Sequence, residues 1–150
     1  EKSVLAIEDV MKKDVEDNAY ALMRTADGKV ASLHSSATSW RHRFNLDITL
    51  SNGALTLAGI LSGSKSYGDE TLTIAKPAER ESADPREETI CYSEDPSWMA
   101  EIEEFTNVIV NGGKIINGSV EDAYKTMEMV YKIYCADTEW QKRWNLKWQP

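Results

Sequence analysis

The sequence predicts an α+β protein in which a largely antiparallel, open-faced β-sheet carries two C-terminal helices on one face. Three observations lead to this class. Strand-like segments fill the first two thirds of the chain, glycine turns join them in pairs, and the apolar spacing becomes helical after Asp95. Because the strands come first and the helices last, we expect the helices to pack together on one face of the sheet.

Two glycine turns, Asp27-Gly28 and Asn52-Gly53, indicate two antiparallel hairpins. Both dipeptides supply the positive φ angles that two-residue hairpin turns require. Further strands are predicted before the first hairpin and after the second, although residues 4–13 also fit a helix. The Pro-containing segment 76–88 between the last two strands is expected to be a loop. The predicted strands are residues 2–7, 15–25, 29–38, 43–50, 54–62, 70–75 and a short edge strand at 89–92.

The strand at 43–50 indicates which face of the sheet is buried. Its apolar and polar residues alternate with a period of two, Phe44, Leu46, Ile48 and Leu50 against Asn45, Asp47 and Thr49. One face is therefore expected to be buried and the other to be polar and open. An open sheet face predicts that the protein forms a homo-oligomer through it.

The two helices have recognisable ends. The first is predicted to have Asp95 as its cap and Pro96 as its first residue, and to end at a Gly-Gly pair. The second begins at Ser119, where Asp122 completes an approximate capping box, and runs to Trp140. Its apolar stripe is wide enough to cover a sheet.

Size and charge limit the possible partners. The chain has 150 residues, 41% of them hydrophobic and 28% charged, so we expect residues 1–150 to fold as a single domain. Its net charge of −8 repels a phosphate backbone, which argues against nucleic acid as a partner. No run approaches the roughly 18 apolar residues of a membrane span, and the first residues lack the apolar stretch of a signal peptide.

The two cysteines, Cys91 and Cys135, have no CxxC spacing and no histidine cluster near them in the sequence. This argues against a metal site or a thiol redox motif. We expect both to be buried, reduced thiols, which suits a cytoplasmic protein.

Several segments resemble, in order, the C-terminal α/β domain of the Gfo/Idh/MocA (glucose-fructose oxidoreductase and inositol dehydrogenase-like) family. The closing helices of that family commonly read Gly-Ser-x-Glu-Asp-Ala and end near Tyr-x-Ala-Asp, similar to the strings that begin at Gly118 and Tyr134 here. Each string alone is unspecific, but together they are collinear over most of the chain. The similar segments are residues 17–24, 27–36, 40–53, 64–72, 98–105 and 118–140.

The resemblance implies a parent oxidoreductase that acts on a sugar, sugar nucleotide or cyclitol with NAD or NADP. This chain would be its substrate-side and oligomerisation domain, inactive alone, with the N-terminal dinucleotide-binding (Rossmann) domain missing. The chain lacks the Gly-x-Gly-x-x-Gly fingerprint and the family's Glu-Lys-Pro signature, of which Lys76-Pro77 shares only two letters. The family's acid/base pair is expected before Glu1. We therefore assign no catalytic, cofactor-binding or metal-ligating residue to this chain.

Trp40, Arg41 and His42 are the candidate substrate-binding residues. In the family this region can approach the substrate. Indole, imidazole and guanidinium groups suit stacking on a sugar ring and donating hydrogen bonds to its hydroxyls or phosphates. The alternative is a set of solvated side chains at the start of a strand.

Other positions have both a functional and a structural interpretation. His34 either lines the same surface or is an ordinary hydrogen-bonded sheet residue, and the turn around Tyr67 either contacts ligand or only reverses the chain. Trp140, Trp144 and Trp148 recur every four residues, either as a docking surface or as a cover for the protein's own core. For the whole chain, the alternative to the oxidoreductase domain is a free-standing protein-binding or scaffolding module that uses the open sheet face.

Overall fold

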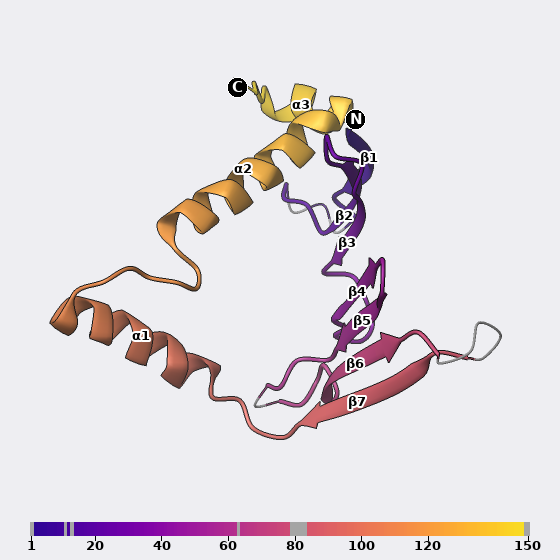
Figure 1. Cartoon of the computed structure of the whole chain (residues 1–150). Coiled ribbons are helices and arrows are strands. Elements are labelled where there is room, and N and C mark those ends of the chain that lie inside the picture. The colour runs from indigo at the N-terminus through magenta and orange to yellow at the C-terminus, as the bar shows by residue number, and fades with distance from the viewer. Residues whose placement is uncertain (1, 11, 13, 63, 79–83, 149–150) are drawn as a thin grey trace. The chain divides into compact units, whose positions relative to one another are not determined.

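The computed structural model of the protein describes residues 2–10, 12, 14–62, 64–78 and 84–148. Its elements are labelled in Figure 1. The strands are β1 (Lys2–Glu8), β2 (Asn18–Arg24), β3 (Val30–Ser36), β4 (Asn45–Leu50), β5 (Gly53–Ala58), β6 (Glu70–Lys76) and β7 (Arg86–Tyr92). The helices are α1 (Ser97–Asn111), α2 (Val120–Ala136) and α3 (Thr138–Trp144).

The predicted α+β class with antiparallel sheets is confirmed. The strands form two sheets, a three-stranded one in the order β1-β2-β3 and a four-stranded one in the order β4-β5-β6-β7. The sequence-based prediction placed them in one sheet and named two helices, whereas the structure divides the sheet and adds α3. Nothing local in the sequence marks this division, because each hairpin pairs in the same way within either arrangement.

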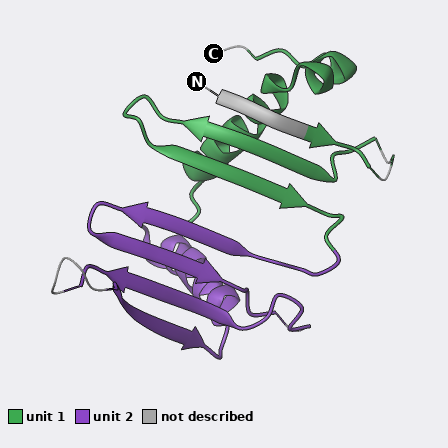
Figure 2. Ribbon diagram, turned by 90° about the vertical axis from the view of Figure 1, so that its right-hand side faces the viewer, with its two compact units in different colours: residues 1–39, 113–150 green, residues 40–112 purple. Residues whose placement is uncertain are grey.

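The chain separates into two compact units, shown in different colours in Figure 2. Unit 1 comprises residues 1–39 and 113–150, and so contains β1 to β3, α2 and α3. Unit 2 comprises residues 40–112, and so contains β4 to β7 and α1. The expectation that residues 1–150 fold as one domain stays a prediction, and each unit is described by itself.

Unit 1 is built by packing α2 on its sheet. Ala21 of β2 is 2% exposed and Ile133 of α2 is 7% exposed, and both line the same small cavity between helix and sheet. The start of α2 follows the prediction. The amide of Asp122 donates to Ser119 Oγ over 3.2 Å, and the amide of Ser119 donates to Asp122 Oδ2 over 3.2 Å, which completes the capping box.

The end of α2 differs from the prediction of one helical run to Trp140. Asp137 has an extended conformation, with φ −83° and ψ 112°, and separates α2 from α3. Its carboxylate accepts hydrogen bonds from the amide of Trp140 over 2.8 Å and from the amide of Ile7 in β1 over 3.2 Å. Asp137 therefore caps α3 and ties the helices to the sheet. This long-range contact explains the break.

The two hairpin turns lie close to their predicted positions. In the first, the amide of Thr25 donates to the carbonyl of Lys29 over 2.9 Å, and Gly28 has φ +90°, so the loop consists of residues 26–28, between the predicted strand ends. In the second, Leu50 pairs with Gly53, so Gly53 belongs to β5 and not to the turn. A Cβ atom at Gly53 would lie 2.3 Å from the carbonyl oxygen of Ala75 in β6, so close strand approach requires glycine there.

The register of the four-stranded sheet sorts its side chains into two faces. One cross-strand row consists of Asp47, Thr56, Thr73 and Thr89, and the neighbouring row on the other face consists of Leu46, Leu57, Leu72 and Ile90. The alternation predicted from the strand at 43–50 thus continues through β5, β6 and β7. The expected burial of the apolar face is not seen at its edge strands, because Leu46 is 45% exposed and Ile90 is 38% exposed. We call the face that carries the threonine row the open face.

Three details of unit 2 differ from the predictions. The first C-terminal helix begins at Ser97, with Pro96 as its N-cap, while Asp95 accepts a hydrogen bond from the amide of Ser97 over 3.1 Å. β7 begins at Arg86, so it takes up part of the predicted loop, and residues 79–83 of that loop lie outside the described residues. Cys91 is a free thiol but exposed, contrary to the expected burial, because every residue of the edge strand β7 is exposed; Cys135, in unit 1, is half-buried.

Candidate functional site

The predicted substrate-binding residues Trp40, Arg41 and His42 lie in the segment that leads into β4, and all three are exposed. Trp40 has a fractional exposure of 106%, so its indole is open to solvent on all sides. An indole in this state can offer its face to a ligand, but unit 2 supplies no wall around it. The structure therefore places the three residues together along the chain without enclosing them.

His42 is the member of this group that the structure joins to another candidate. Its imidazole meets the ring of Tyr67 edge to face, with the ring centroids 5.0 Å apart. Tyr67 comes from the turn before β6, so two predicted positions that are distant in the sequence form one aromatic pair. The pair combines an apolar ring with an imidazole that can donate or accept a hydrogen bond, which is suitable chemistry for a hydroxylated ring.

His34 belongs to unit 1 and has a different environment. It stacks on Tyr20 of the neighbouring strand, with ring centroids 4.3 Å apart and an interplanar angle of 12°. The two residues are directly paired in the register of β2 and β3. This arrangement agrees with the structural interpretation of His34, because cross-strand aromatic pairs stabilise a sheet.

Sequence reasoning missed a pocket in unit 1. It lies between α2, the start of β2 and the end of β3, and has a volume of about 380 Å³. Its walls contain both polar and apolar groups. They are formed by Glu16, Asp17, Asn18, Ala19, Leu33, Ser35, Ser36, Ala37, Met129, Val130, Ile133 and Tyr134.

Glu16 and Tyr134 form a hydrogen bond across this pocket's wall, in which the phenol donates to Glu16 Oε1. Burial raises the pKa of Tyr134 to about 12, and the hydrogen bond to Glu16 and the negative charge of that carboxylate act in the same direction. The phenol is therefore neutral at physiological pH and acts as a donor. It holds the carboxylate in place beside α2.

A buried polar network lies beside this hydrogen bond. Asp17 and Asn18 are both buried, and Asn18 Nδ2 donates to Asp17 Oδ1 and to Thr38 Oγ1, each over 3.0 Å. The hydroxyls of Ser36 and Thr38 lie 3.2 Å apart. The network fixes the start of β2 against the end of β3. The sequence signal for it was the polar run that begins at Glu16 within the predicted strand 15–25, but the sequence does not show that these polar residues are buried.

Of the three C-terminal tryptophans, Trp140 favours the core-covering interpretation, whereas Trp144 and Trp148 are 43% and 36% exposed. Trp140 is 8% exposed and stacks with Tyr134 at 6.4 Å, so it covers the core of unit 1. Asn145, with φ +49°, ends α3, so Trp148 does not continue the helical stripe. Trp148 instead packs against Tyr131, with ring centroids 6.1 Å apart.

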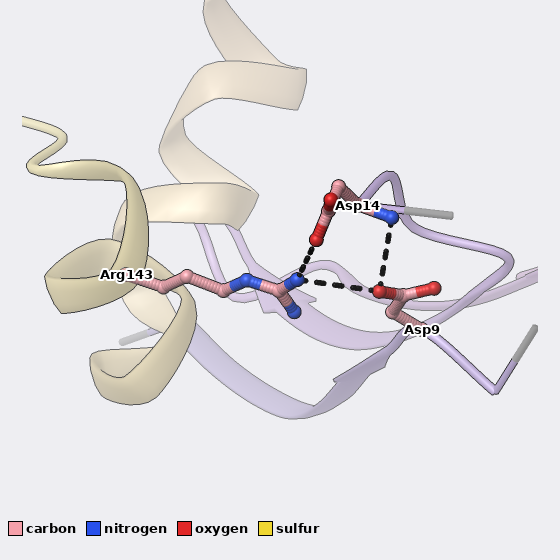
Figure 3. A network of polar contacts seen from close by, with 3 residues as sticks. All are labelled: Asp9, Asp14 and Arg143. Atoms are coloured by element: carbon pink, nitrogen blue, oxygen red, sulfur yellow. Dashed lines mark hydrogen bonds and ion pairs between the residues drawn. The ribbon is translucent and has the colours of Figure 1, made fainter. Parts of the chain in front are cut away.

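Arg143 of α3 contacts the loop that follows β1 (Figure 3). Its guanidinium lies 3.3 Å from Asp9 Oδ2 and 2.5 Å from Asp14 Oδ1, and the amide of Asp14 also donates to Asp9 Oδ2 over 3.1 Å. The same guanidinium lies over the ring of Trp140 at 5.5 Å. These contacts hold α3 on unit 1 and have a structural interpretation.

The open face of unit 2 is the other surface that the sequence singled out. Thr56 Oγ1 donates to Asp47 Oδ1 over 2.7 Å, and the hydroxyls of Thr73 and Thr89 lie 3.0 Å apart. The polar groups of this row thus bond to one another along the sheet. Such a face exposes short side chains on a regular surface, which allows a second sheet to approach it closely.

Within the part of the chain that the structure describes, no group of three or more His, Cys, Asp or Glu residues is placed to hold a metal ion. Among the same residues, none of the helices has the length and apolar character needed to cross a bilayer. Comparisons of the chain with protein-family models, with curated proteins and with solved structures found no match.

Proposed function

We propose that this chain is the substrate-side and dimerisation domain of a nicotinamide-dependent oxidoreductase that acts on a sugar, sugar nucleotide or cyclitol. The observation that carries the proposal is the ordered resemblance to the Gfo/Idh/MocA C-terminal domain. In support, Tyr134 and Asp137, the two polar residues of the string that matches Tyr-x-Ala-Asp, have contacts that attach α2 to the rest of unit 1. The residues that resemble the family motif thus have a structural role in this fold, because they attach α2 to its neighbours.

In the proposed reaction, an alcohol carbon of the substrate loses a hydride to NAD or NADP and its hydroxyl loses a proton, which leaves a carbonyl. The cofactor accepts the hydride, and the acid/base groups belong to the dinucleotide-binding domain that we propose as the partner of this chain. The role of the present residues is to position the substrate. Trp40 would stack on the ring, while His42 and Arg41 would bond to hydroxyl or phosphate oxygens.

The open face of unit 2 is the proposed dimer contact, and its occupant is a second copy of this chain. Its cross-strand row of one aspartate and three threonines is regular and lacks large side chains, as sheet-on-sheet packing requires. A lysine in place of Thr73, at the centre of this face, is expected to shift the protein to monomers in sedimentation velocity. Lysine in place of Asn52, at the tip of the hairpin, is the matched control and is expected to leave the dimer intact.

The second candidate function is a free-standing protein-binding module. One observation favours it, because α1 has no buried residue among those described, and Trp98 on its apolar stripe is 76% exposed. An apolar helix face of this kind fits a protein partner. Like the oxidoreductase domain, the module would be cytoplasmic, since its cysteines are free thiols.

The reading frame upstream of the Glu1 codon distinguishes the two candidates. An in-frame domain with a Gly-x-Gly-x-x-Gly turn supports the oxidoreductase, whereas an immediate start codon supports the module. The purified 150-residue chain is expected to reduce neither NAD nor NADP with any sugar or cyclitol of a test panel. Reduction by this chain alone would contradict the proposed division of labour.

Kinetics of the parent protein test the positioning role. The His42→Ala variant is expected to raise KM for the sugar by roughly tenfold, the effect of losing one hydrogen bond to a charged or polar group. Lys29→Ala, an exposed change in the first hairpin turn, is the control and should leave KM unchanged. Equal KM values for both variants would remove His42 from the substrate site.

A further inference from the structure

The pocket of unit 1 has the properties of a small-molecule site that is separate from the proposed sugar site. Its volume of about 380 Å³ lies within the range of roughly 300 to 1,000 Å³ that is typical of ligand pockets. All of its walls belong to unit 1, whereas Trp40, Arg41, His42 and the open face belong to unit 2. An occupant of this pocket is therefore recognised by different groups.

The charge of the pocket selects the sign of the ligand. Two carboxylates, Glu16 and Asp17, stand in its wall, and none of its lining residues is Lys, Arg or His. A concave site whose wall contains carboxylates and no cationic side chain attracts cations and repels anions. Phosphorylated sugars, nucleotides and carboxylic acids are therefore disfavoured.

The hydrogen bonds already present in the wall favour an amine over a polyol as the ligand. Asn18 and Ser36 are already engaged with Thr38, so they offer few free donors and acceptors to a ligand with many hydroxyls. Glu16 uses Oε1 to accept from Tyr134, its partner among the described residues, and its second oxygen can accept from a ligand. A carboxylate oxygen of this kind suits a ligand with a charged donor group.

The rest of the wall is apolar. Leu33 from β3 and Met129, Val130 and Ile133 from α2 contribute apolar side chains to the wall. Contact of these side chains with a hydrocarbon group is favourable because it removes apolar surface from water, but they cannot form hydrogen bonds with hydroxyl groups. The favoured ligand thus has a compact apolar body next to its charged group.

We infer that this pocket binds a small protonated amine, with its ammonium group on the Glu16 carboxylate and its hydrocarbon body against Met129, Val130 and Ile133. The inference does not depend on the proposed oxidoreductase function, because it uses only the walls of unit 1. Each can fail without the other.

Calorimetric titration of the whole 150-residue chain tests the inference with three probes that share a phenethyl group and differ in charge. Phenethylamine carries the positive charge, phenethyl alcohol is neutral, and phenylpropanoate is an anion. The amine is expected to bind roughly tenfold more tightly than the alcohol, the effect of about one charge-assisted hydrogen bond, and the anion is expected not to bind. Equal binding of all three probes, or no binding of the amine, would overturn the inference.

Three variants locate the interaction. Glu16→Gln is expected to remove the roughly tenfold preference for the amine over the alcohol. Glu139→Gln removes a carboxylate on the exposed surface of α3 and should keep that preference, which controls for net charge. Val130→Trp fills the pocket and should abolish binding, with circular dichroism to verify that the helices are retained. If Glu16→Gln keeps the preference, or Glu139→Gln loses it equally, the ammonium site is not at Glu16.

Discussion

Substitution of Gly59 by alanine tests the packing of the four-stranded sheet most sharply. Gly59 follows β5 and has φ +74°, and its amide donates to the carbonyl of Phe44 over 3.1 Å. A Cβ atom at this position would lie 2.0 Å from the carbonyl oxygen of Asp69, just before β6. Because the obstructing atom belongs to the backbone, a side-chain rotation cannot relieve the contact.

The magnitude follows from two contributions. Placing alanine in the left-handed region costs roughly 1 to 2 kcal/mol. Displacing packed backbone to make room for the methyl group costs about 1 to 3 kcal/mol more. Gly68 supplies the control, because its φ of +83° is similar but nothing lies within 4 Å of its Cβ position. We expect only the first cost to lower the stability of Gly68→Ala, and both costs to lower the stability of Gly59→Ala.

Urea denaturation followed by circular dichroism measures both variants against the unsubstituted chain. The alanine also restricts the unfolded chain, but it does so equally in the two variants, so their difference isolates the contact with Asp69. The predicted difference is about 1 to 3 kcal/mol in the free energy of unfolding. If Gly59→Ala is no less stable than Gly68→Ala, the backbone at Gly59 does not lie as close to the carbonyl of Asp69 as the structure shows.

Substitutions at three other contacts are expected to have smaller effects. Ser119→Ala removes the capping box of α2 and should lower the unfolding free energy by about 1 kcal/mol in urea denaturation; an unchanged midpoint would contradict the box. Arg143→Met removes the ion pairs with the two aspartates of Figure 3. Because the Arg143 side chain is 43% exposed, solvent screening should limit the loss of unfolding free energy, measured by thermal unfolding, to about 1 kcal/mol. A more stable variant would contradict the role of Arg143 in holding α3 on unit 1. Tyr134 has its pKa raised from 10.0 to about 12, so its contribution to stability is complete below pH 10 and is lost as the pH rises to 12. Ultraviolet titration should show one fewer late-titrating tyrosine in Tyr134→Phe, and identical curves would refute the shift.

Local signals predicted most of the secondary structure. The glycine of Asp27-Gly28 specifies its turn through its own φ angle, and the Ser119 capping box is complete within four residues, so neither depends on distant parts of the chain. The alternation of apolar and polar residues in β4 likewise predicted which residues of β5 to β7 share a face. Hairpin pairing carries that pattern from strand to strand.

Several of the features that sequence reasoning missed depend on contacts between distant segments. Asp137 divides the last helix because its carboxylate bonds to the amide of Ile7, a residue at the other end of the chain. Glu16 lines a pocket because Tyr134 reaches it from α2. For the candidate site, the residue types around Trp40 were visible in the sequence, but the pairing of His42 with Tyr67 depends on how the turn before β6 folds back.

The most direct test of the proposed function is the rate of nicotinamide reduction by the protein encoded by the entire reading frame. With a panel of sugars, sugar nucleotides and cyclitols, we predict that the absorbance of the reduced nicotinamide increases only when both an alcohol substrate and NAD or NADP are present. That rate should fall at low substrate concentration in His42→Ala and persist in Lys29→Ala. A whole protein that binds neither nicotinamide cofactor and reduces neither with any member of the panel would contradict the account.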